Sequence, residues 1–413
     1  MNLLVVRLGS MGDIIHTLPA VVALRRAFPG ATIGWAVEPR WAALLSSVAA
    51  ISAPRSPEKP LADIIHAVDT LAWRAALLSG ETWRAARDAI RELRARRYDL
   101  AIDFQGAWKS AILAQLSRAP RRLGFMQPRE KPATLFYTHQ VAARGRHVVE
   151  QNLSLAAAVA PPLSRPGEPA PKRSEGARQR GAVPETPYGA PTQHDEFSFP
   201  LPRDPAAERA VDRQLRAHGL HSLVIVNPGA GWGAKCWPAE RYAEVVRALA
   251  VHGLRTIVNF GPGEEQLARD VERAANTVPD AVAPPLSRPG ESAPKRSERP
   301  RQGGSVPPAI AMSATVAELM ALCRRARLCI GGDTGPVHLA AALDVPLVAL
   351  FGPTDPARTG PYSPRAIVLR SFVSQTTSSH EKEPEAGLLQ ITATEVIAAA
   401  RYLLAQPAEV RQR

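Results

Sequence analysis

The residues best suited to chemistry lie in two glycine-rich turns, one in each half of the chain. Gly331–Gly335 (Gly-Gly-Asp-Thr-Gly) follows the apolar run Leu328–Ile330, and Gly9–Asp13 (Gly-Ser-Met-Gly-Asp) follows the apolar run Asn2–Leu8. A strand, a glycine-rich turn and a helix start together form an anion site, because glycines let the backbone approach a phosphate and the helix N-terminus offers unpaired amides. Two such turns indicate a ligand held between two α/β domains.

Neither turn carries a standard nucleotide-binding fingerprint. The spacing Gly9-x-x-Gly12 is incomplete for a dinucleotide site, and the sequence has no Gly-Lys-Ser/Thr loop. A single turn of this kind is more often a plain connection between strand and helix than a catalytic loop. A functional role for these turns is therefore indicated by their occurrence as a pair, each with a charged residue inside it.

Three charged side chains near these turns have a chemical interpretation beside a structural one. Asp13 is either the N-cap of a helix that begins at Ile14 or a carboxylate that takes a proton from a hydroxyl group. The stretch Asn227–Pro238 contains three glycines before Lys235, which predicts a loop whose lysine contacts a phosphate. Glu264 either begins a helix or binds a ribose diol at a strand end.

The second turn adds two more candidates. The carboxylate of Asp333 would repel a diphosphate, so we expect it to accept hydrogen bonds from sugar hydroxyls. His338, in the first turn of the following helix, suits a structural role as well as a ligand contact. The three cysteines of the chain have no metal-ligand spacing and are predicted to be free thiols.

These residues need a scaffold of alternating strands and helices. Apolar β-type runs predict strands at 2–8, 31–37, 98–104, 222–227, 254–260, 327–331 and 345–351. Helical patterns cover 14–27, 81–96, 109–117, 239–252, 264–275, 315–325 and 336–343. This alternation is typical of doubly wound, parallel α/β domains. We expect one domain at 1–195, a second at 196–375 and a tail at 376–413 whose helix, over 392–406, is open to packing back on the first domain.

Two related segments interrupt this pattern. Ala158–Glu168 recurs letter for letter as Ala281–Glu291, and both copies continue into stretches rich in Pro, Arg and Ser. Such a composition cannot bury enough apolar surface to offset the entropy lost on ordering. We therefore predict disordered surface insertions at about 160–187 and 283–309.

The net charge of +13 is partly located in these insertions. They carry five basic residues against three acidic ones and five against two, which leaves +8 on the rest of the chain. The arginines from Arg84 to Arg97 are predicted to form a solvated helix surface. Lys109, Arg129 and Lys131 follow a strand end, where an anionic acceptor could bind. No run spans a bilayer and no signal peptide is evident, so a cytoplasmic protein is expected.

Several motifs together resemble one enzyme family. They are Arg7–Ala20, Tyr98–Gly106, Lys235-x-Trp-Pro238, Asp333–His338 and Phe351–Pro356. In combination they are similar to the ADP-heptose:lipopolysaccharide heptosyltransferases of glycosyltransferase family 9, closest to the heptosyltransferase I branch. The resemblance covers nearly the whole chain except the two insertions.

The resemblance implies a GT-B fold, in which two Rossmann-like domains face an interdomain cleft. It implies inverting transfer of heptose from ADP-L-glycero-D-manno-heptose to Kdo of lipid A. By position, Asp13 matches the catalytic base, Lys235 the phosphate-binding lysine, Glu264 the ribose carboxylate and Met312 the adenine contact. Asp333, Thr334 and Gly335, with His338 beside them, match the contacts to diphosphate and heptose.

The resemblance also sets expectations about cofactors and partners. No Asp-x-Asp pair is placed to hold a metal on the diphosphate, so a metal-independent reaction without cofactor is expected. Peripheral contact with the cytoplasmic face of the inner membrane is expected, and a nucleic-acid partner is not. Heptosyltransferase II, or a relative with another acceptor, stays open. So do a nucleotide-sugar epimerase and a non-catalytic sugar-nucleotide binder on the same fold.

Overall fold

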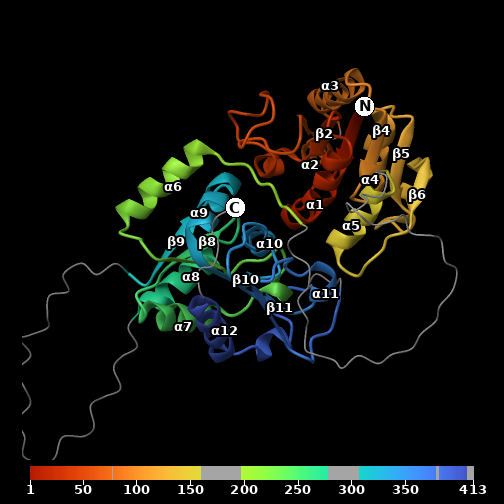
Figure 1. The fold of residues 1–413 in the computed structure, drawn as a ribbon. Helices are drawn as coiled ribbons and strands as arrows, with labels where there is room; N and C mark the ends of the chain where they lie inside the picture. The colour runs from red at the N-terminus through yellow and green to blue at the C-terminus, as the bar shows by residue number, and fades with distance from the viewer. Residues whose placement is uncertain (77, 160–196, 278–306, 378–380, 407–413) are drawn as a thin grey trace, which may run out of the picture. The chain divides into compact units, whose positions relative to one another are not determined.

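The computed structural model describes residues 1–76, 78–159, 197–277, 307–377 and 381–406. They divide into two compact units (Figure 1). Unit 1 comprises Met1–Pro205, Ala341–Asp344 and Asp355–Ala366, and unit 2 comprises Ala206–Ala340, Val345–Thr354 and Ile367–Arg413. The predicted insertion at 160–187 lies outside the described residues, as does the one at 283–309 except for its last three positions.

Unit 1 is built on a six-stranded sheet in the order β3-β2-β1-β4-β5-β6, with every neighbouring pair parallel. Its strands are β1 (Asn2–Val6), β2 (Thr32–Val37), β3 (Ile64–Ala67), β4 (Leu100–Asp103), β5 (Arg121–Phe125) and β6 (His139–Val141). Its α-helices are α1 (Met11–Ala27), α2 (Thr70–Ala75), α3 (Gly80–Ala95), α4 (Trp108–Leu116), α5 (Val148–Ala157) and α11 (Pro356–Thr359). The 3₁₀ turns η1 (Pro39–Leu44) and η2 (Lys131–Phe136) complete it.

Unit 2 has a second six-stranded sheet, in the order β12-β11-β10-β7-β8-β9. Its strands are β7 (Leu223–Asn227), β8 (Arg255–Phe260), β9 (Ala309–Ser313), β10 (Ala326–Gly332), β11 (Leu347–Phe351) and β12 (Ala366–Arg370). Its α-helices are α6 (Pro205–Ala217), α7 (Ala239–Ala250), α8 (Glu265–Asn276), α9 (Val316–Arg325), α10 (Gly335–Ala342) and α12 (Ala393–Ala405). The 3₁₀ turns η3 (Gly233–Lys235) and η4 (Leu388–Gln390) complete it.

Both sheets follow the same winding. Counted from its own first strand, each has the spatial order 3-2-1-4-5-6, so the winding direction reverses between β1 and β4 and again between β7 and β10. In doubly wound sheets, ligands bind outside the carboxyl ends of the strands at this reversal. The topology therefore predicts ligand sites at the turns after β1 and β4 in unit 1 and after β7 and β10 in unit 2.

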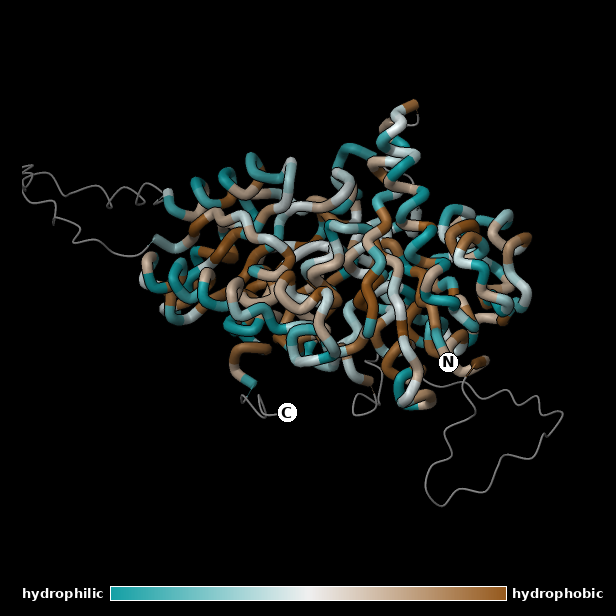
Figure 2. Tube along the Cα trace, turned by 90° about the horizontal axis from the view of Figure 1, so that it is seen from above, coloured by the Kyte–Doolittle hydropathy of each residue, from teal (hydrophilic) through white to brown (hydrophobic). Residues whose placement is uncertain are grey.

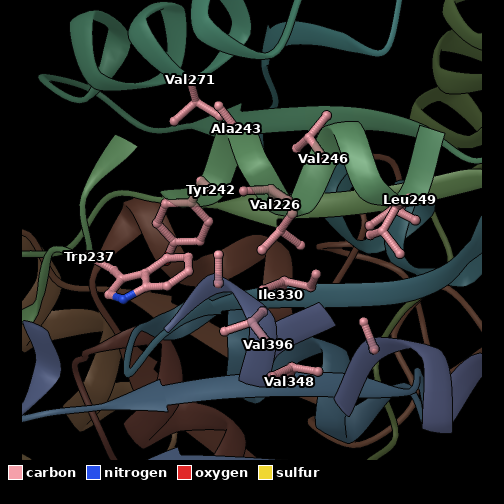
Figure 3. Close-up of a cluster of buried hydrophobic side chains, with 14 of the residues drawn as sticks. Val226, Trp237, Tyr242, Ala243, Val246, Leu249, Val271, Ile330, Val348 and Val396 are labelled. Carbon is pink, nitrogen blue, oxygen red and sulfur yellow. The ribbon is translucent and has the colours of Figure 1, made fainter. Parts of the chain in front are cut away.

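The core of unit 2 explains how one of these turns is anchored. Trp237 and Tyr242 are both buried, and their rings meet edge to face at 4.9 Å. Figure 3 shows the two rings against each other, near Val226 and Ile330 of the sheet and Val396 of α12. Trp237 Nε1 donates to the carbonyl of residue 391 at 3.0 Å. Since Trp237 is two residues after Lys235, this packing fixes the end of the lysine loop.

The terminal helix belongs to unit 2. α12 packs against α7, β10 and β11, with Val396, Ala400 and Leu403 buried against the sheet. The sequence left open that this helix packs on the first domain, and it ended the second domain at 375. The structure differs because the buried positions of α12 continue the core around Trp237. Unit 1 also extends to Pro205, beyond the predicted boundary at 195.

The predicted strands and helices all appear within a few residues of their expected positions. The sequence missed β3, β5, β6, β9, β12 and the helices α2, α5, α6 and α11. These elements are short or weakly patterned: β6 has three residues, and β5 begins with two arginines. The insertion boundary at 309 was wrong, because Ala309 is the first residue of β9 and exchanges two hydrogen bonds with the Asn276 side chain, at 3.0 and 2.9 Å.

Candidate functional sites at the two sheet edges

The turn after β1 places Asp13 one helical turn further into α1 than the sequence suggested. The helix begins at Met11 with Ser10 as its N-cap, so Asp13 occupies the third helical position. Its Oδ2 accepts the backbone N–H of Ser10 at 3.0 Å, which is the return bond of a capping box. The prediction that Asp13 is itself the N-cap was wrong, because Ser10 fills that position.

A buried arginine holds the other side of the Asp13 carboxylate. Arg7 Nη2 lies 2.5 Å from Asp13 Oδ1, and Arg7 Nη1 donates to the carbonyl of Phe104 at the end of β4. The Arg7 side chain is 7% exposed, whereas that of Asp13 is 35% exposed. Gln105 Oε1 also accepts the N–H of Leu8 at 2.8 Å. The ends of β1 and β4 are thereby tied together around an oriented, solvent-reachable carboxylate.

Asp103, the carboxylate at the end of the neighbouring strand β4, is fully buried in the structure. Its carboxylate accepts hydrogen bonds from the hydroxyls of Tyr137 (2.7 Å) and Ser110 (2.8 Å) and from the backbone amides of residues 105 and 106. Burial raises the pKa of Asp103, although these hydrogen bonds oppose the shift. A carboxylate so enclosed organises the turn after β4 and cannot reach a substrate hydroxyl.

The basic candidates of unit 1 gather near the same edge. Lys109 is in the first turn of α4, and its Nζ donates to Thr70 Oγ1 at 3.3 Å. Arg129 and Lys131 are exposed in the loop after β5. That loop is tied to the turn after β4, because the N–H of Glu130 donates to the Gly106 carbonyl at 2.9 Å. The structure thus brings all three to the carboxyl edge of the first sheet.

In unit 2, Lys235 and Asp333 form one ion pair. Lys235 Nζ lies 2.6 Å from Asp333 Oδ2, and the two side chains are 12% and 7% exposed. The ammonium also sits over the ring of Trp232, 4.7 Å from its centroid. Lys235 follows β7 and Asp333 follows β10, so the pair spans the reversal of strand order. The sequence assigned the two side chains to different parts of a ligand and missed their pairing.

Two more side chains complete the environment of Asp333. Thr354 Oγ1 donates to Asp333 Oδ2 at 2.8 Å, and His338 Nε2 lies 3.2 Å from Asp333 Oδ1. Burial alone would raise the pKa of Asp333, but His338 and Lys235 together outweigh it and hold the pKa well below the usual range. A depressed carboxyl pKa stabilises the fold above the unfolded value of about 4, and this stability is lost only as the pH falls through the folded pKa. The ion pair therefore persists through neutral and mildly acidic pH.

Glu264 and Met312 lie at the ends of the next two strands. Glu264 is the N-cap of α8, and its Oε2 accepts the N–H of Gly261 at 2.9 Å. A Cβ on Gly229 would come within 2.2 Å of the Glu264 carboxyl carbon, so a larger residue there would displace the Glu264 side chain. The loops after β7 and β8 therefore meet at this carboxylate. Met312 pairs in register with Asn259 of β8 and is half-buried.

The remaining donor-site candidates lie where α10 begins. Thr334 Oγ1 donates to the Gly332 carbonyl at 3.2 Å, and Gly335 is the first residue of α10. His338 is buried in the first turn of this helix. Thr334 and Gly335 thus present the helix N-terminus at the carboxyl end of β10, where the topology favours a ligand.

The C-terminal segment supports the lysine loop, an interaction that no pattern in the sequence indicated. The N–H of Ala234 donates to the carbonyl of Glu381, and the N–H of Glu385 donates to the carbonyl of Ala234, both at 3.1 Å. A Cβ on Gly233 would come within 1.6 Å of the Lys382 carbonyl oxygen. Thr354 and Arg7 were also missed as site residues, although both lie within motifs that the sequence singled out.

Comparison with known proteins gives these sites a context. The family model "Glycosyltransferase family 9 (heptosyltransferase)" matches residues 86–287 and 305–389. Lipopolysaccharide heptosyltransferase 1 of Escherichia coli O18:K1:H7 is 31% identical over 93% of this chain and 96% of its own length. The corresponding protein of Pseudomonas aeruginosa is 28% identical over 90% and 84%. An Escherichia coli lipopolysaccharide heptosyltransferase 3 is 26% identical over 95% and 96%.

Solved structures share the fold. Escherichia coli heptosyltransferase WaaC with ADP superimposes with a TM-score of 0.68 at 23% identity, covering 98% of this chain and 100% of that one. Escherichia coli ADP-heptose heptosyltransferase II gives a TM-score of 0.67 at 20% identity, covering 98% of each chain. These matches confirm the expected GT-B class of two doubly wound α/β domains. The family model matches most of the chain, and a family member is 31% identical over 93% of it. The chain is therefore a glycosyltransferase that belongs to family 9, the heptosyltransferases.

Proposed function

We propose that this protein is an inverting heptosyltransferase of the lipopolysaccharide inner core, which transfers heptose from ADP-L-glycero-D-manno-heptose to Kdo of lipid A. The observation that carries the proposal is the 31% identity to a lipopolysaccharide heptosyltransferase 1 over 93% of the chain. The charged groups at the two strand-order reversals support it, because one offers a proton acceptor and the other a cation for a diphosphate.

In the proposed reaction Asp13 is the general base. A sugar hydroxyl is a weak nucleophile, so a positioned carboxylate takes its proton as the new C–O bond forms. Arg7 and the Ser10 amide fix the orientation of Asp13. Lys109, Arg129 and Lys131 supply positive charge for an acidic acceptor. A single base acting opposite the leaving group gives one displacement, with inversion at the anomeric carbon.

The donor site of the proposal is the carboxyl edge of unit 2. Lys235 binds the diphosphate and balances the charge that ADP gains as it leaves, and the N-terminus of α10 at Thr334 and Gly335 adds to this stabilisation. Glu264 binds the ribose and Met312 lines the adenine. Asp333 and His338 hold Lys235 in place and contact the heptose.

The direct test is incubation of the protein with ADP-heptose and Kdo-bearing lipid A, followed by mass spectrometry of the lipid. The proposal predicts a gain of one heptose residue together with release of ADP. Release of ADP with no change in the lipid would contradict transfer to this acceptor. Conversion of the nucleotide sugar without any acceptor would indicate an epimerase.

A sibling activity is the second candidate. The 26% identity to an Escherichia coli heptosyltransferase 3, over 95% of the chain, favours a family member that acts on a different acceptor. The same assay with lipid A that already carries one or two heptoses separates the two candidates. Transfer to the heptose-bearing lipid alone would replace the Kdo acceptor in the proposal.

We propose further that transfer needs no metal ion. Among the residues with described positions, no three His, Cys, Asp or Glu side chains gather as a metal site. Instead of a metal ion, Lys235 and the positive end of the α10 dipole would stabilise the diphosphate. Addition of EDTA is therefore expected to leave most of the turnover intact. Loss of turnover that Mg²⁺ or Mn²⁺ restores would contradict this mechanism.

The proposed acceptor is a membrane lipid, so the proposal includes peripheral contact with the cytoplasmic face of the inner membrane. No helix in the described part of the chain is long and apolar enough to cross a membrane. The contact would therefore depend on surface residues.

A further inference from the structure

Helix α3 of unit 1 carries a row of arginines and an exposed tryptophan on one side of its surface. Its inner face packs on the unit through Leu93, which is fully buried. At about 100° per residue, the exposed positions fall on two flanks. One flank carries the arginines Arg84, Arg87 and Arg91 together with Trp83, and the other carries the acids Glu81, Asp88 and Glu92. The two flanks adjoin, since Arg84 lies 4.0 Å from Glu81 and Arg91 lies 3.6 Å from Asp88. These exposed pairs neutralise part of the basic flank and leave Arg87 and Trp83 at its centre.

Exposed apolar side chains lie next to this basic flank, near the turn that joins α2 to α3. Leu78, in the turn between α2 and α3, is completely exposed (102%), and Trp83 is 63% exposed. Leu71 in α2 is 42% exposed. In Figure 2 this tip is the brown end of the helix that projects at the top of the picture. Single exposed apolar side chains occur elsewhere, as at Phe372 (97%). Here Leu78 and Trp83 differ from these because they accompany a row of arginines on the same segment.

The arginines and the exposed apolar side chains together indicate what kind of partner this surface binds. Arginines attract anionic headgroups, while leucine and tryptophan at the tip of a helix insert at the boundary between headgroups and acyl chains. Residues 70–95 contain five arginines against three carboxylates. Helix α6 offers a contrast in unit 2: Arg209, Arg213 and Arg216 are exposed, but its apolar side chains Val211 and Leu215 are buried.

We propose that the α2–α3 hairpin, the segment from Thr70 to Ala95, is the surface by which unit 1 docks on an anionic lipid bilayer. The inference rests on the proposed function, because a lipid acceptor requires the enzyme to work at a membrane. It also revises the interpretation of Arg84–Arg97 as a merely solvated face. The arginine flank supplies attraction at a distance, and Leu78 and Trp83 supply the contact.

The test uses the full chain with vesicles of phosphatidylethanolamine and phosphatidylglycerol, and with neutral phosphatidylcholine vesicles for comparison. The triple variant Arg84→Glu/Arg87→Glu/Arg91→Glu is expected to bind the anionic vesicles at least about a hundredfold more weakly. The double variant Leu78→Ser/Trp83→Ser is expected to lose about tenfold while keeping its salt dependence. Both variants change exposed residues, so their melting temperatures should stay near the parental value.

Matched controls carry the same chemical changes elsewhere. Arg209→Glu/Arg213→Glu/Arg216→Glu in α6 reverses the same charge, and Phe372→Ser removes a 97% exposed apolar side chain in unit 2. Neither control should weaken vesicle binding as much as the hairpin variants do. Equal losses in control and hairpin variants, or unchanged binding in the hairpin variants, would overturn the docking surface. Binding of soluble polyanions in place of vesicles would overturn it too.

An acyl-free acceptor separates this inference from the proposed function. Both hairpin variants should transfer heptose to a deacylated, water-soluble Kdo acceptor at nearly the parental rate, and lose activity only on vesicle-bound acceptor. A matching loss on the soluble acceptor would make the hairpin part of the sugar-binding site and overturn docking. Absence of transfer by the parental protein to either acceptor would instead contradict the proposed function, whatever the vesicles show.

Discussion

Replacement of Asp13 by Asn is expected to lower kcat by about 10²–10⁴-fold, the usual contribution of a general base. The amide keeps the shape of the carboxylate and can still accept the N–H of Ser10, but it cannot take the proton of a hydroxyl. ADP-heptose affinity should stay close to the parental value, because the proposed donor site lies in unit 2. Steady-state kinetics with separate measurement of donor binding tests this.

The structure adds a stability control to this experiment. Asp13→Asn also removes the ion pair with Arg7, so a small decrease in melting temperature is expected besides the loss of activity. Glu395→Gln makes the same change at the third position of the capping box of α12. It should leave kcat unchanged. If the Asp13 variant retained the parental kcat, the base would have to be another group, and the enclosure of Asp103 excludes that residue.

Replacement of Lys235 by Ala is expected to reduce kcat by about 10²–10³-fold, as for removal of a group that stabilises developing negative charge. The affinity for ADP should fall as well, since the ammonium is the proposed contact to the diphosphate. Isothermal titration calorimetry with ADP would measure the loss of affinity, and single-turnover transfer would measure the loss of rate.

A neighbouring lysine provides the control. Lys382 is exposed, and its carbonyl, not its side chain, packs against Gly233. Lys382→Ala therefore removes a positive charge near the loop without disturbing its backbone support, and kcat should stay near the parental value. Unchanged ADP affinity and kcat in the Lys235 variant would restrict this lysine to its structural pairing with Asp333.

The sequence predicted the main strands and the edges at which the candidate residues gather. The buried runs of β1, β7, β10 and β11 are continuous, as parallel strands require, and this made their ends recognisable. Asp13, Lys235 and Asp333 were singled out because each follows such a strand in a glycine-containing turn. The two sheet edges could therefore be located from local pattern alone.

Partnerships between distant residues could not be predicted in the same way. Lys235 and Asp333 are neighbours only because β7 and β10 are adjacent in the sheet, a pairing that no local pattern encodes. Helix α1 begins three residues earlier than predicted, because Ser10 and not Asp13 is its N-cap. Glu381 and Glu385 lie in a loop with no regular pattern, far along the chain from the lysine loop that they contact.

That contact has a consequence for the order in which the protein matures during synthesis. The loop that carries Lys235 leaves the ribosome long before Glu381 and Glu385, yet both backbone hydrogen bonds of Ala234 are made with these late residues. A nascent chain that already contains all strands of the second sheet still lacks the support for its lysine loop. We therefore expect products of interrupted translation that end before residue 381 to bind ADP more weakly than the full chain, because the proposed donor loop lacks this support.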